Sequence, residues 1–368
     1  MAVRFCEPKI LAQGAGIAIE FSRSEAPMRI AQISTVETPV LREGGDSIEH
    51  MVWVLTNELT KLGHDVTVFA AAGSQVNGKL VATLPGPLGQ NGAPLDWRFC
   101  EVLNLTRALE HSGEFDVLHS HAYLWGVPFE RLSRAPIVHT LHVTPYDDVK
   151  PLLTLRPSTT ITAISRYQWS ELPWMKPFAV VHHGVETGMF TLREKPDDYV
   201  CYLGRFIPDK GPLAAIAAAR ALGVRLVMAG PPGEYFSECI APHADGKNVE
   251  YIGRVNAAER DRLLGGARAF LYPVEAAEPF GLVQIEAMLC GTPVVAMRLG
   301  AVPEIIDEGV TGFSTQTPEE FIRMIPRAFA LDRRRVRETA ERRFSSERMA
   351  REYVEVYERV VREAAHKR

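Results

Sequence analysis

Short apolar segments alternate with helical patterns along the chain, and this alternation constrains the fold more than any other feature. Residues 28–35, MRIAQIST, are predicted to form a buried strand. Apolar residues at helical spacing follow over 48–62, Gly63 ends that pattern, and a second strand is predicted at 65–71. A strand, a helix and a strand in this order predict a parallel sheet covered by helices.

The same alternation continues and then restarts after a polar segment at 191–198. The first half is predicted to contain a further helix at 97–111 and further strands at 116–121, 136–142, 159–165 and 178–185. The second half is predicted to contain strands at 199–205, 224–230, 249–255, 267–273 and 292–297 and helices at 211–222, 257–267, 281–290 and 331–366. The chain is therefore predicted to be an α/β protein with two Rossmann-like doubly wound domains facing a central cleft. Ligands of such folds bind beyond the carboxyl ends of the strands.

Four segments are expected along the chain. Residues 1–27 are interpreted as a dispensable or disordered N-terminal extension, because Met28 stands directly before the first convincing strand. Residues 28–190 and 191–345 are expected to form the two domains. Residues 346–368 are expected to form a C-terminal helix that crosses back to the first domain.

The composition is that of an ordinary soluble globular protein, with 46% hydrophobic residues, 23% charged residues and a net charge of -4. A mildly acidic chain of this kind is not expected to bind nucleic acid. The five cysteines are scattered without C-x-x-C spacing, which argues against zinc and against a disulfide framework. A reducing, cytoplasmic location is therefore expected, and no apolar run reaches the roughly 18 residues of a membrane-spanning helix.

The stretch EPFGLVQIEAM, residues 278–288, places two acids around a predicted helix start. Backbone N–H groups at a helix start lack internal partners, and the helix dipole favours an anion there. Gly281 permits a ligand to approach the backbone closely. Glu278 and Glu286 offer carboxylates to the hydroxyl groups of a sugar or ribose. A capped surface helix with solvated acids is the alternative interpretation.

Two bases bracket a turn in LGRFIPDKG, residues 203–211. Arg205, with its planar fork, and Lys210, as a point charge, would neutralise a pyrophosphate. A pair of ordinary surface bases is the alternative. Gly44 and Gly45 follow the first strand and resemble a phosphate-approach loop, although a two-glycine turn is a weak signal.

Several histidines stand at the ends of predicted strands, and His121 is expected to face the cleft. Metal ligation by these histidines is the less favoured alternative. The aspartate pairs at 147–148 and 197–198 are interpreted as solvated turns rather than metal sites. The basic run at 331–343 is interpreted as a solvated helical face, with weak peripheral contact to an anionic membrane as the alternative.

Taken together, these stretches resemble the retaining glycosyltransferases of family 4, the group 1 glycosyltransferases with the GT-B fold. The matching stretches follow the order of the family over about residues 28–313. They include GG at 44–45, FDVLHSH, VVHHGVE, LGRFIPDKG, NVEYIGRV and AEPFGLVQIEAMLCGTPVVA. The chain departs from the commonest pattern at His183, Glu186 and Pro279, which leaves the subfamily and the acceptor open.

The resemblance implies a role for each matched residue. Arg205 and Lys210 would hold the diphosphate of a nucleotide-diphospho-sugar. Glu278 would contact sugar hydroxyls, Glu286 the ribose, and His121 would lie near the transferred sugar. Of these, His121, Glu278, Arg205 and Lys210 would be the catalytic residues. The remaining donor contacts would come from Gly45, Gly253, Arg254, Val255, Phe280, Gly281, Leu282 and Val283.

The resemblance further implies front-face transfer of a hexosyl group with retained anomeric configuration. UDP-glucose is the preferred donor, and the acceptor is an unidentified hydroxyl on a small molecule, a saccharide or a lipid-linked compound. No metal or other cofactor is expected, because two cations and a helix start would stabilise the diphosphate. A GT-B sugar-nucleotide epimerase and an inactive sugar-nucleotide-binding protein are the alternatives, and the oligomeric state stays open.

Overall fold

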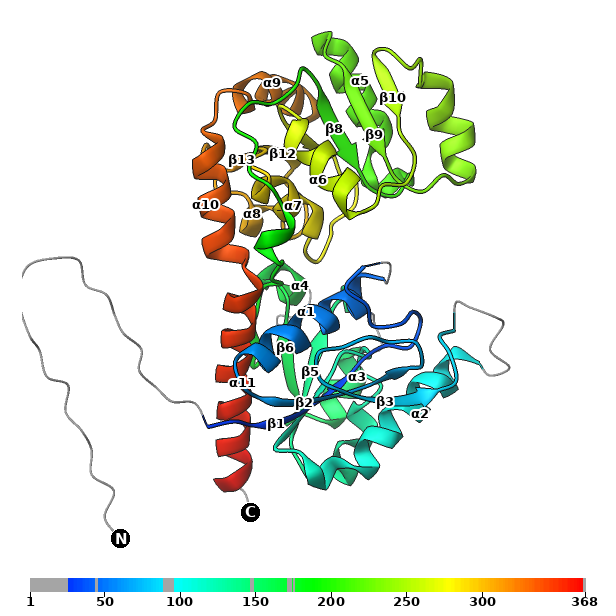
Figure 1. Cartoon of the computed structure of the whole chain (residues 1–368), viewed down its shortest axis with the longest axis vertical. Coiled ribbons are helices and arrows are strands. Elements are labelled where there is room, and N and C mark those ends of the chain that lie inside the picture. Colours follow the sequence, from blue (N-terminus) through cyan, green and yellow to red (C-terminus); the bar gives the residue numbers. More distant parts are fainter. Residues whose placement is uncertain are drawn as a thin grey trace, which may run out of the picture.

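The computed structural model describes residues 26–43, 46–88, 96–145, 149–170, 174 and 176–366. It contains two separate parallel sheets with helices packed on their faces (Figure 1). The predicted α/β architecture of two Rossmann-like domains is therefore confirmed.

The first sheet has seven strands in the order β3-β2-β1-β4-β5-β6-β7. Its strands are β1 (Arg29–Ile33), β2 (Asp65–Ala71), β3 (Lys79–Leu84), β4 (Val117–Ser120), β5 (Ile137–Leu141), β6 (Thr160–Ala163) and β7 (Ala179–Val180). The α-helices of this half are α1 (Ser47–Lys61), α2 (Trp97–Glu110), α3 (Val149–Leu155) and α4 (Arg166–Ser170).

The second sheet has six strands in the order β10-β9-β8-β11-β12-β13. Its strands are β8 (Val200–Leu203), β9 (Leu226–Ala229), β10 (Val249–Tyr251), β11 (Phe270–Tyr272), β12 (Val294–Met297) and β13 (Gly312–Thr315). The helices that follow are α5 (Pro212–Leu222), α6 (Ala257–Gly266), α7 (Leu282–Leu289), α8 (Val302–Ile305), α9 (Pro318–Ala328), α10 (Arg333–Phe344) and α11 (Ser346–His366).

The strand order positions the sites of this molecule. The sequence order of the strands reverses between β1 and β4 in one sheet and between β8 and β11 in the other. The carboxyl ends of such strands border a crevice where doubly wound folds bind ligands. The strands themselves are buried on both faces, as the continuous burial of β4 and β9 shows, so their apolar runs identify them in the sequence.

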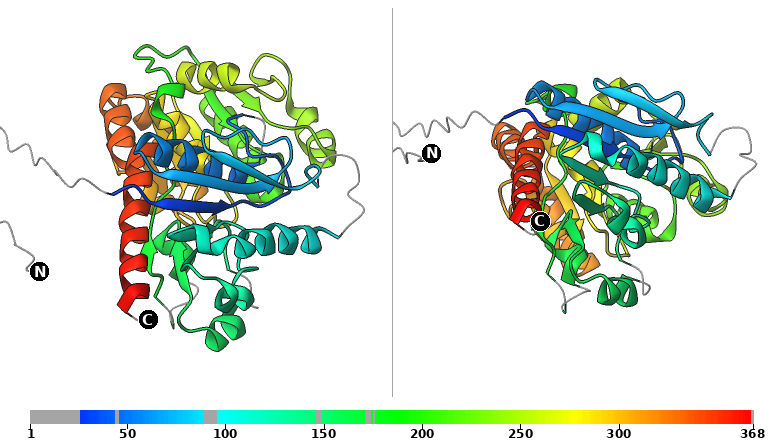
Figure 2. Two further views of the ribbon diagram at one scale, coloured as in Figure 1. Left: turned by 60° about the horizontal axis from the view of Figure 1, so that its bottom comes forward. Right: turned by 90° about the horizontal axis from the view of Figure 1, so that it is seen from below.

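The C-terminal helix α11 runs from the second domain along the first (Figures 1 and 2). Its Tyr353 and Tyr357 share a hydrophobic core with α1 residues such as Leu55. Directly before α11 begins, Ser345 forms an isolated parallel β-bridge with Val185. Although α11 has 21 residues, it carries many charges. No helix in the described ranges has both the length and the apolar character needed to cross a bilayer.

Several elements differ from the sequence prediction, and α3, α4, α8, α9 and β13 were not predicted at all. The strand β3 was not predicted, because it is an edge strand with only one buried residue and so lacks a buried apolar run. The strand expected at 178–185 is only the two-residue β7. The single helix expected at 331–366 is divided into two helices, α10 and the long α11. Ser345 adopts an extended conformation between them.

Candidate functional site

A cavity of about 800 Å³ lies between the two domains. We call it the interdomain cavity. Its first-domain wall includes Arg42, Ser47 and His50, from the end of the β1 loop and the start of α1. The second-domain wall brings together six residues that were predicted from the sequence, namely Arg205, Lys210, Val255, Leu282, Val283 and Glu286.

The charge of this cavity suits an anion. The described lining residues include four bases and two acids, namely Arg42, Arg205, Lys210, Arg260, Glu43 and Glu286. His50 adds no positive charge at neutral pH, because burial and the nearby Arg260 lower its pKa. The cavity lining therefore has more bases than acids, and two of these bases, Arg42 and Lys210, pair with Glu186 and Glu278, which are not lining residues.

Two loops of the second domain meet at the ion pair between Lys210 and Glu278. Both side chains are largely buried, with 20% and 18% of their surface exposed. Gly211 lets the loops approach, because a Cβ at this position would lie 1.8 Å from the carbonyl oxygen of Pro273. Lys210 and Glu278 were predicted to act at one site, and the structure places them in contact.

The helix α7 begins beside the cavity. Gly281 precedes it with a φ of +109°, a conformation that L side chains rarely adopt, and a Cβ there would lie 2.5 Å from Nε2 of Gln284. Leu282 and Val283, the first two helical residues, line the cavity. The first turn of α7 therefore directs free backbone N–H groups toward this region.

Glu286 lies in the second turn of α7 and pairs with a base that was not predicted. Its Oε1 accepts from Nη1 of Arg260 at 3.0 Å. Burial raises the pKa of Glu286, and the positive charge of Arg260 opposes this shift. Arg260 belongs to α6, whose charged sequence AAERDRLLGG resembles any solvent-facing helix, so no signal in the sequence distinguished it.

The loops after β8 and β10 complete the second-domain wall. Arg205 follows β8 and is exposed at the cavity. Gly253 has a φ of +84°, and its carbonyl accepts the Gly230 N–H at 3.0 Å, which joins the loops after β9 and β10. Val255 lines the cavity, whereas Gly253 and the exposed Arg254 are not among its lining residues.

Other predicted residues lie elsewhere. The ring of Phe280 is buried and packs edge-on against His183, with ring centroids 5.1 Å apart. Glu278, Phe280 and Gly281 are not among the residues that line the interdomain cavity, although Glu278 contacts the lining residue Lys210. Gly45 lies outside the described residues.

His121 belongs to a chain of buried hydrogen bonds. Its Nε2 lies 2.7 Å from Oε1 of Gln32, and its Nδ1 lies 2.9 Å from Nε2 of His142. The amide oxygen only accepts, so Nε2 of His121 carries the proton and Nδ1 accepts from His142. Burial, followed by the neighbouring His119, His142 and His183, holds the pKa of His121 well below its usual value. The ring is therefore neutral and has both nitrogens engaged.

The structure separates His121 from the bases of the interdomain cavity. His121 and His142 line a second cavity of about 340 Å³, which we call the aromatic cavity, within the first domain. The two cavities share the start of α1, because Ser47 lines the interdomain cavity and its neighbour Ile48 lines the aromatic one.

The C-terminal helix α11 contributes to the polar network behind His121. Nε2 of Gln32 donates to the Tyr357 hydroxyl at 3.1 Å, and that hydroxyl lies 2.6 Å from Nδ1 of His119. Nε2 of His119 lies 2.7 Å from the hydroxyl of Thr140. The Tyr357 hydroxyl therefore joins two strands of the first sheet to a helix that starts in the second domain.

The candidate metal positions receive no support from the geometry. No group of three or more His, Cys, Asp or Glu side chains in the described parts of the chain is arranged to hold a metal ion. Asp198 is 92% exposed and pairs with Arg268, as a solvated turn would. Residues 147–148 lie outside the described residues. Metal independence stays a prediction.

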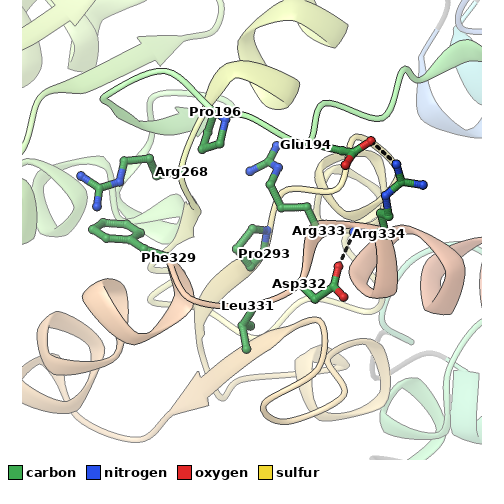
Figure 3. Close-up of a pocket in the computed structure, with 9 residues that line it drawn as sticks. All are labelled: Glu194, Pro196, Arg268, Pro293, Phe329, Leu331, Asp332, Arg333 and Arg334. Carbon is green, nitrogen blue, oxygen red and sulfur yellow. Dashed lines mark hydrogen bonds and ion pairs between the residues drawn. The ribbon is translucent and has the colours of Figure 1, made fainter.

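The basic run at 331–343 is only partly a solvated face. Arg333 is 8% exposed and donates to several backbone carbonyls of the second domain. Arg343 donates to two carbonyls of α8. Arg334 remains exposed and pairs with Glu194 beside a cavity of about 270 Å³ (Figure 3). Fewer of these bases are thus available for membrane contact than the sequence suggested.

Two family descriptions match successive parts of the chain. Residues 48–188 match the family described as Glycosyltransferase Family 4. Residues 189–343 match the family described as Glycosyl transferases group 1. The two matches adjoin and together cover every strand of the two sheets except β1.

Related proteins and solved structures agree with these matches. The D-inositol 3-phosphate glycosyltransferase of Mycolicibacterium smegmatis is 28% identical over 346 residues, which cover 78% of this chain and 80% of that protein. AviGT4, a glycosyltransferase involved in avilamycin A biosynthesis, is 27% identical with a TM-score of 0.68 and covers 91% of this chain and 98% of its own. Anabaena HepE in complex with UDP and glucose shares the fold with a TM-score of 0.68 at 19% identity, over 89% of this chain and 99% of its own. The chain therefore belongs to the group 1, family 4 glycosyltransferases, has their GT-B fold, and is a glycosyltransferase.

Proposed function

We propose that this glycosyltransferase is a retaining, metal-independent hexosyltransferase that uses a nucleotide-diphospho-sugar donor, preferably UDP-glucose. The acceptor is a hydroxyl on a small molecule, a saccharide or a lipid-linked compound. One observation carries the proposal: the interdomain cavity gathers Arg205, Lys210 and Glu286 beside the first turn of α7. Bases that line a cavity beside a helix start favour a diphosphate, because they and the free N–H groups can donate to its oxygens.

The donor would extend across the second-domain wall. Arg205 and Lys210 would neutralise the diphosphate oxygens together with the N–H groups at Leu282 and Val283. Glu286 accepts one bond from Arg260 at 3.0 Å. Its second oxygen would accept from a ribose hydroxyl, because a carboxylate accepts several hydrogen bonds.

Glu278 would serve the sugar. It is paired with Lys210 just behind the cavity wall, so the carboxylate is oriented before the sugar arrives. A carboxylate whose rotamer is already restricted loses less entropy when it accepts sugar hydroxyls. Anabaena HepE, whose structures contain UDP and glucose or UDP-glucose, supports UDP-glucose as the first donor to test.

Transfer would proceed on the front face of the sugar. The leaving diphosphate would take the proton of the acceptor hydroxyl while the glycosidic bond to the diphosphate breaks and the new bond forms on the same face. Charge that accumulates on the leaving diphosphate would be stabilised by Arg205 and Lys210. The neutral His121 would contribute to shape and hydrogen bonding rather than charge.

Calorimetric titration with UDP, GDP and ADP tests the donor assignment. We expect UDP to bind, with the same affinity in EDTA as without it. Slow hydrolysis of UDP-glucose, followed by NMR, should release the α anomer of glucose first. A folded protein that binds none of the three nucleotides would contradict the proposal, and early release of the β anomer would contradict retention.

Substitutions of the cavity bases test the residue assignments. Arg205→Ala, Lys210→Ala and Arg260→Ala should each weaken UDP binding by about 1–3 kcal/mol, because each removes a charge-assisted bond. Arg262→Ala is the matched control, since Arg262 is exposed on the same helix as Arg260 and does not line the cavity. Equal UDP affinity in the Arg260 and Arg262 variants would refute the role of Arg260.

A further inference from the structure

The aromatic cavity occupies the topological switch point of the first sheet. Residues that line it follow the carboxyl ends of β1, β4 and β5, for example Thr35, His121 and His142. Its volume of about 340 Å³ is within the range of small-molecule sites. It adjoins the interdomain cavity at Ser47 and Ile48, so a molecule in it would lie beside the donor.

Aromatic side chains form one wall of this cavity. Trp97 and Trp125 meet edge to face, with ring centroids 5.6 Å apart and planes at 81°. Trp97 is 46% exposed, although tryptophan is usually far more buried. The Arg98 guanidinium lies over the Trp97 ring, 4.8 Å from its centroid, and the remaining indole surface is apolar and suits the face of a ring.

A buried carboxylate with a free oxygen forms another part of the wall. Glu101 is 5% exposed, and its Oε1 accepts the Val36 N–H at 3.1 Å. Its Oε2 is buried without a hydrogen-bond partner in the described part of the chain. An unpartnered buried polar atom is costly, and a ligand hydroxyl would satisfy it.

The described lining of the aromatic cavity offers no positive charge to a second anion. No lysine or arginine stands among the described residues that line it. Its two histidines are neutral, because burial lowers the pKa of each. The acidic Glu37 and Glu49 lie close enough to Glu101 to raise its pKa further. A phosphate or carboxylate in this cavity would therefore be unpaired among acids.

We propose that the aromatic cavity binds the acceptor, and that this acceptor is an uncharged molecule whose ring packs on Trp97 and Trp125 while a hydroxyl donates to Glu101. Phosphorylated and carboxylated acceptors are disfavoured, because their charge would meet no base among the described lining residues. This inference rests on the proposed function, because only transfer requires an acceptor. The ring is a sugar or an aromatic alcohol, and both present an apolar face beside hydroxyl groups.

Matched acceptors test the charge rule with the intact protein and UDP-glucose at pH 8, where Glu101, with a pKa raised by burial to about 7, is ionised. 4-Nitrophenyl β-D-glucoside and 4-nitrophenyl β-D-glucuronide share ring and aglycone and differ by one carboxylate. We expect saturation-transfer NMR to detect binding of the glucoside. We also expect the rate of glucosyl transfer to the glucoside to exceed the rate of transfer to the glucuronide at least about ten-fold. Methyl β-D-glucoside has only the sugar ring and 4-ethylphenol only the aromatic ring. Comparing their binding therefore shows which of the two rings the cavity holds.

Variants test the walls of the cavity. Trp97→Ala and Trp125→Ala should lower kcat/KM for the acceptor about ten-fold, since stacking and apolar burial are lost. Phe99→Ala is the control, because Phe99 is 65% exposed on α2 and does not line the cavity. Glu101→Gln should reduce the preference for the glucoside over the glucuronide to a few-fold.

UDP binding separates the two levels of the inference. Suppose that UDP binds but that no uncharged ring compound binds, or that the glucuronide is used as well as the glucoside. Either result overturns the acceptor inference and leaves the donor assignment unaffected. Unchanged acceptor kinetics in both tryptophan variants also overturn it. If the unmodified protein does not bind UDP, the proposed function is overturned instead.

Discussion

Both acids that define the interdomain site are paired with a base of the same domain. Glu278 is paired with Lys210, and Glu286 with Arg260. These pairs are partly buried, so each carboxylate is held in one orientation. Each base would interact both with its acid and with the diphosphate of a bound donor. Replacing one partner would leave the other partly buried and unpaired. Measured losses of affinity will therefore include some rearrangement of the remaining acid.

Glu101 should make stability depend on pH. Burial, followed by nearby Glu49 and Glu37, raises its pKa from 4.5 to about 7. The folded state therefore binds more protons between these values, and this group lowers stability as pH rises from 4.5 to 7. Glu101→Gln should raise the free energy of unfolding by about 3 kcal/mol at pH 8 and hardly at all at pH 4.5. Urea denaturation at both pH values checks this, and an equal change at both would contradict it.

At the scale of the element, α7 depends on the conformation of the glycine before it. Gly281→Ala should lower stability by about 1–3 kcal/mol, because it forces a side chain into a positive-φ conformation. The new Cβ would also lie 2.5 Å from Nε2 of Gln284. UDP affinity should fall as the first turn of α7 shifts. Calorimetry and urea denaturation measure both effects.

Gly188→Ala, a glycine-to-alanine change outside α7, is the matched control for Gly281→Ala. No atom lies within 4 Å of a Cβ built at Gly188, and its φ is not in the positive range. The control should therefore leave stability and UDP affinity nearly unchanged. If Gly281→Ala behaved like Gly188→Ala, the first turn of α7 would not require the glycine.

At the scale of the whole molecule, α11 links the two domains through buried hydroxyls. Tyr357→Phe removes the group between Gln32 and His119 and leaves both without that partner. We expect a loss of about 1–3 kcal/mol in unfolding free energy. Because Gln32 also orients His121, kcat should fall while UDP affinity stays the same.

Tyr353→Phe provides the comparison on the same helix. The Tyr353 hydroxyl lies 2.9 Å from Thr140 and does not touch Gln32 or His121. Its removal should reduce stability but affect kcat less than Tyr357→Phe. Equal effects on kcat would show that the tyrosines act through the packing of α11 alone.

Much of the fold could be predicted because each strand and helix is signalled by residues near it in sequence. The bounds of β2 and α5 follow from local apolar patterns and flanking glycines, and the structure agrees closely. The edge strand β3 lacked that pattern, since only one of its residues is buried. The loops that hold Arg205 and Lys210 were found because they follow a predicted strand end.

The sequence by itself determined the α/β class, the two-domain order and the loops that carry the donor-site candidates, because periodicity and turn chemistry act over a few residues. Only the tertiary structure brought Arg260 to Glu286, placed His121 on a cavity of its own and carried Tyr357 of α11 to His119. Such contacts join residues far apart in the chain. They depend on how whole elements pack, and no local pattern specifies which side chains then meet.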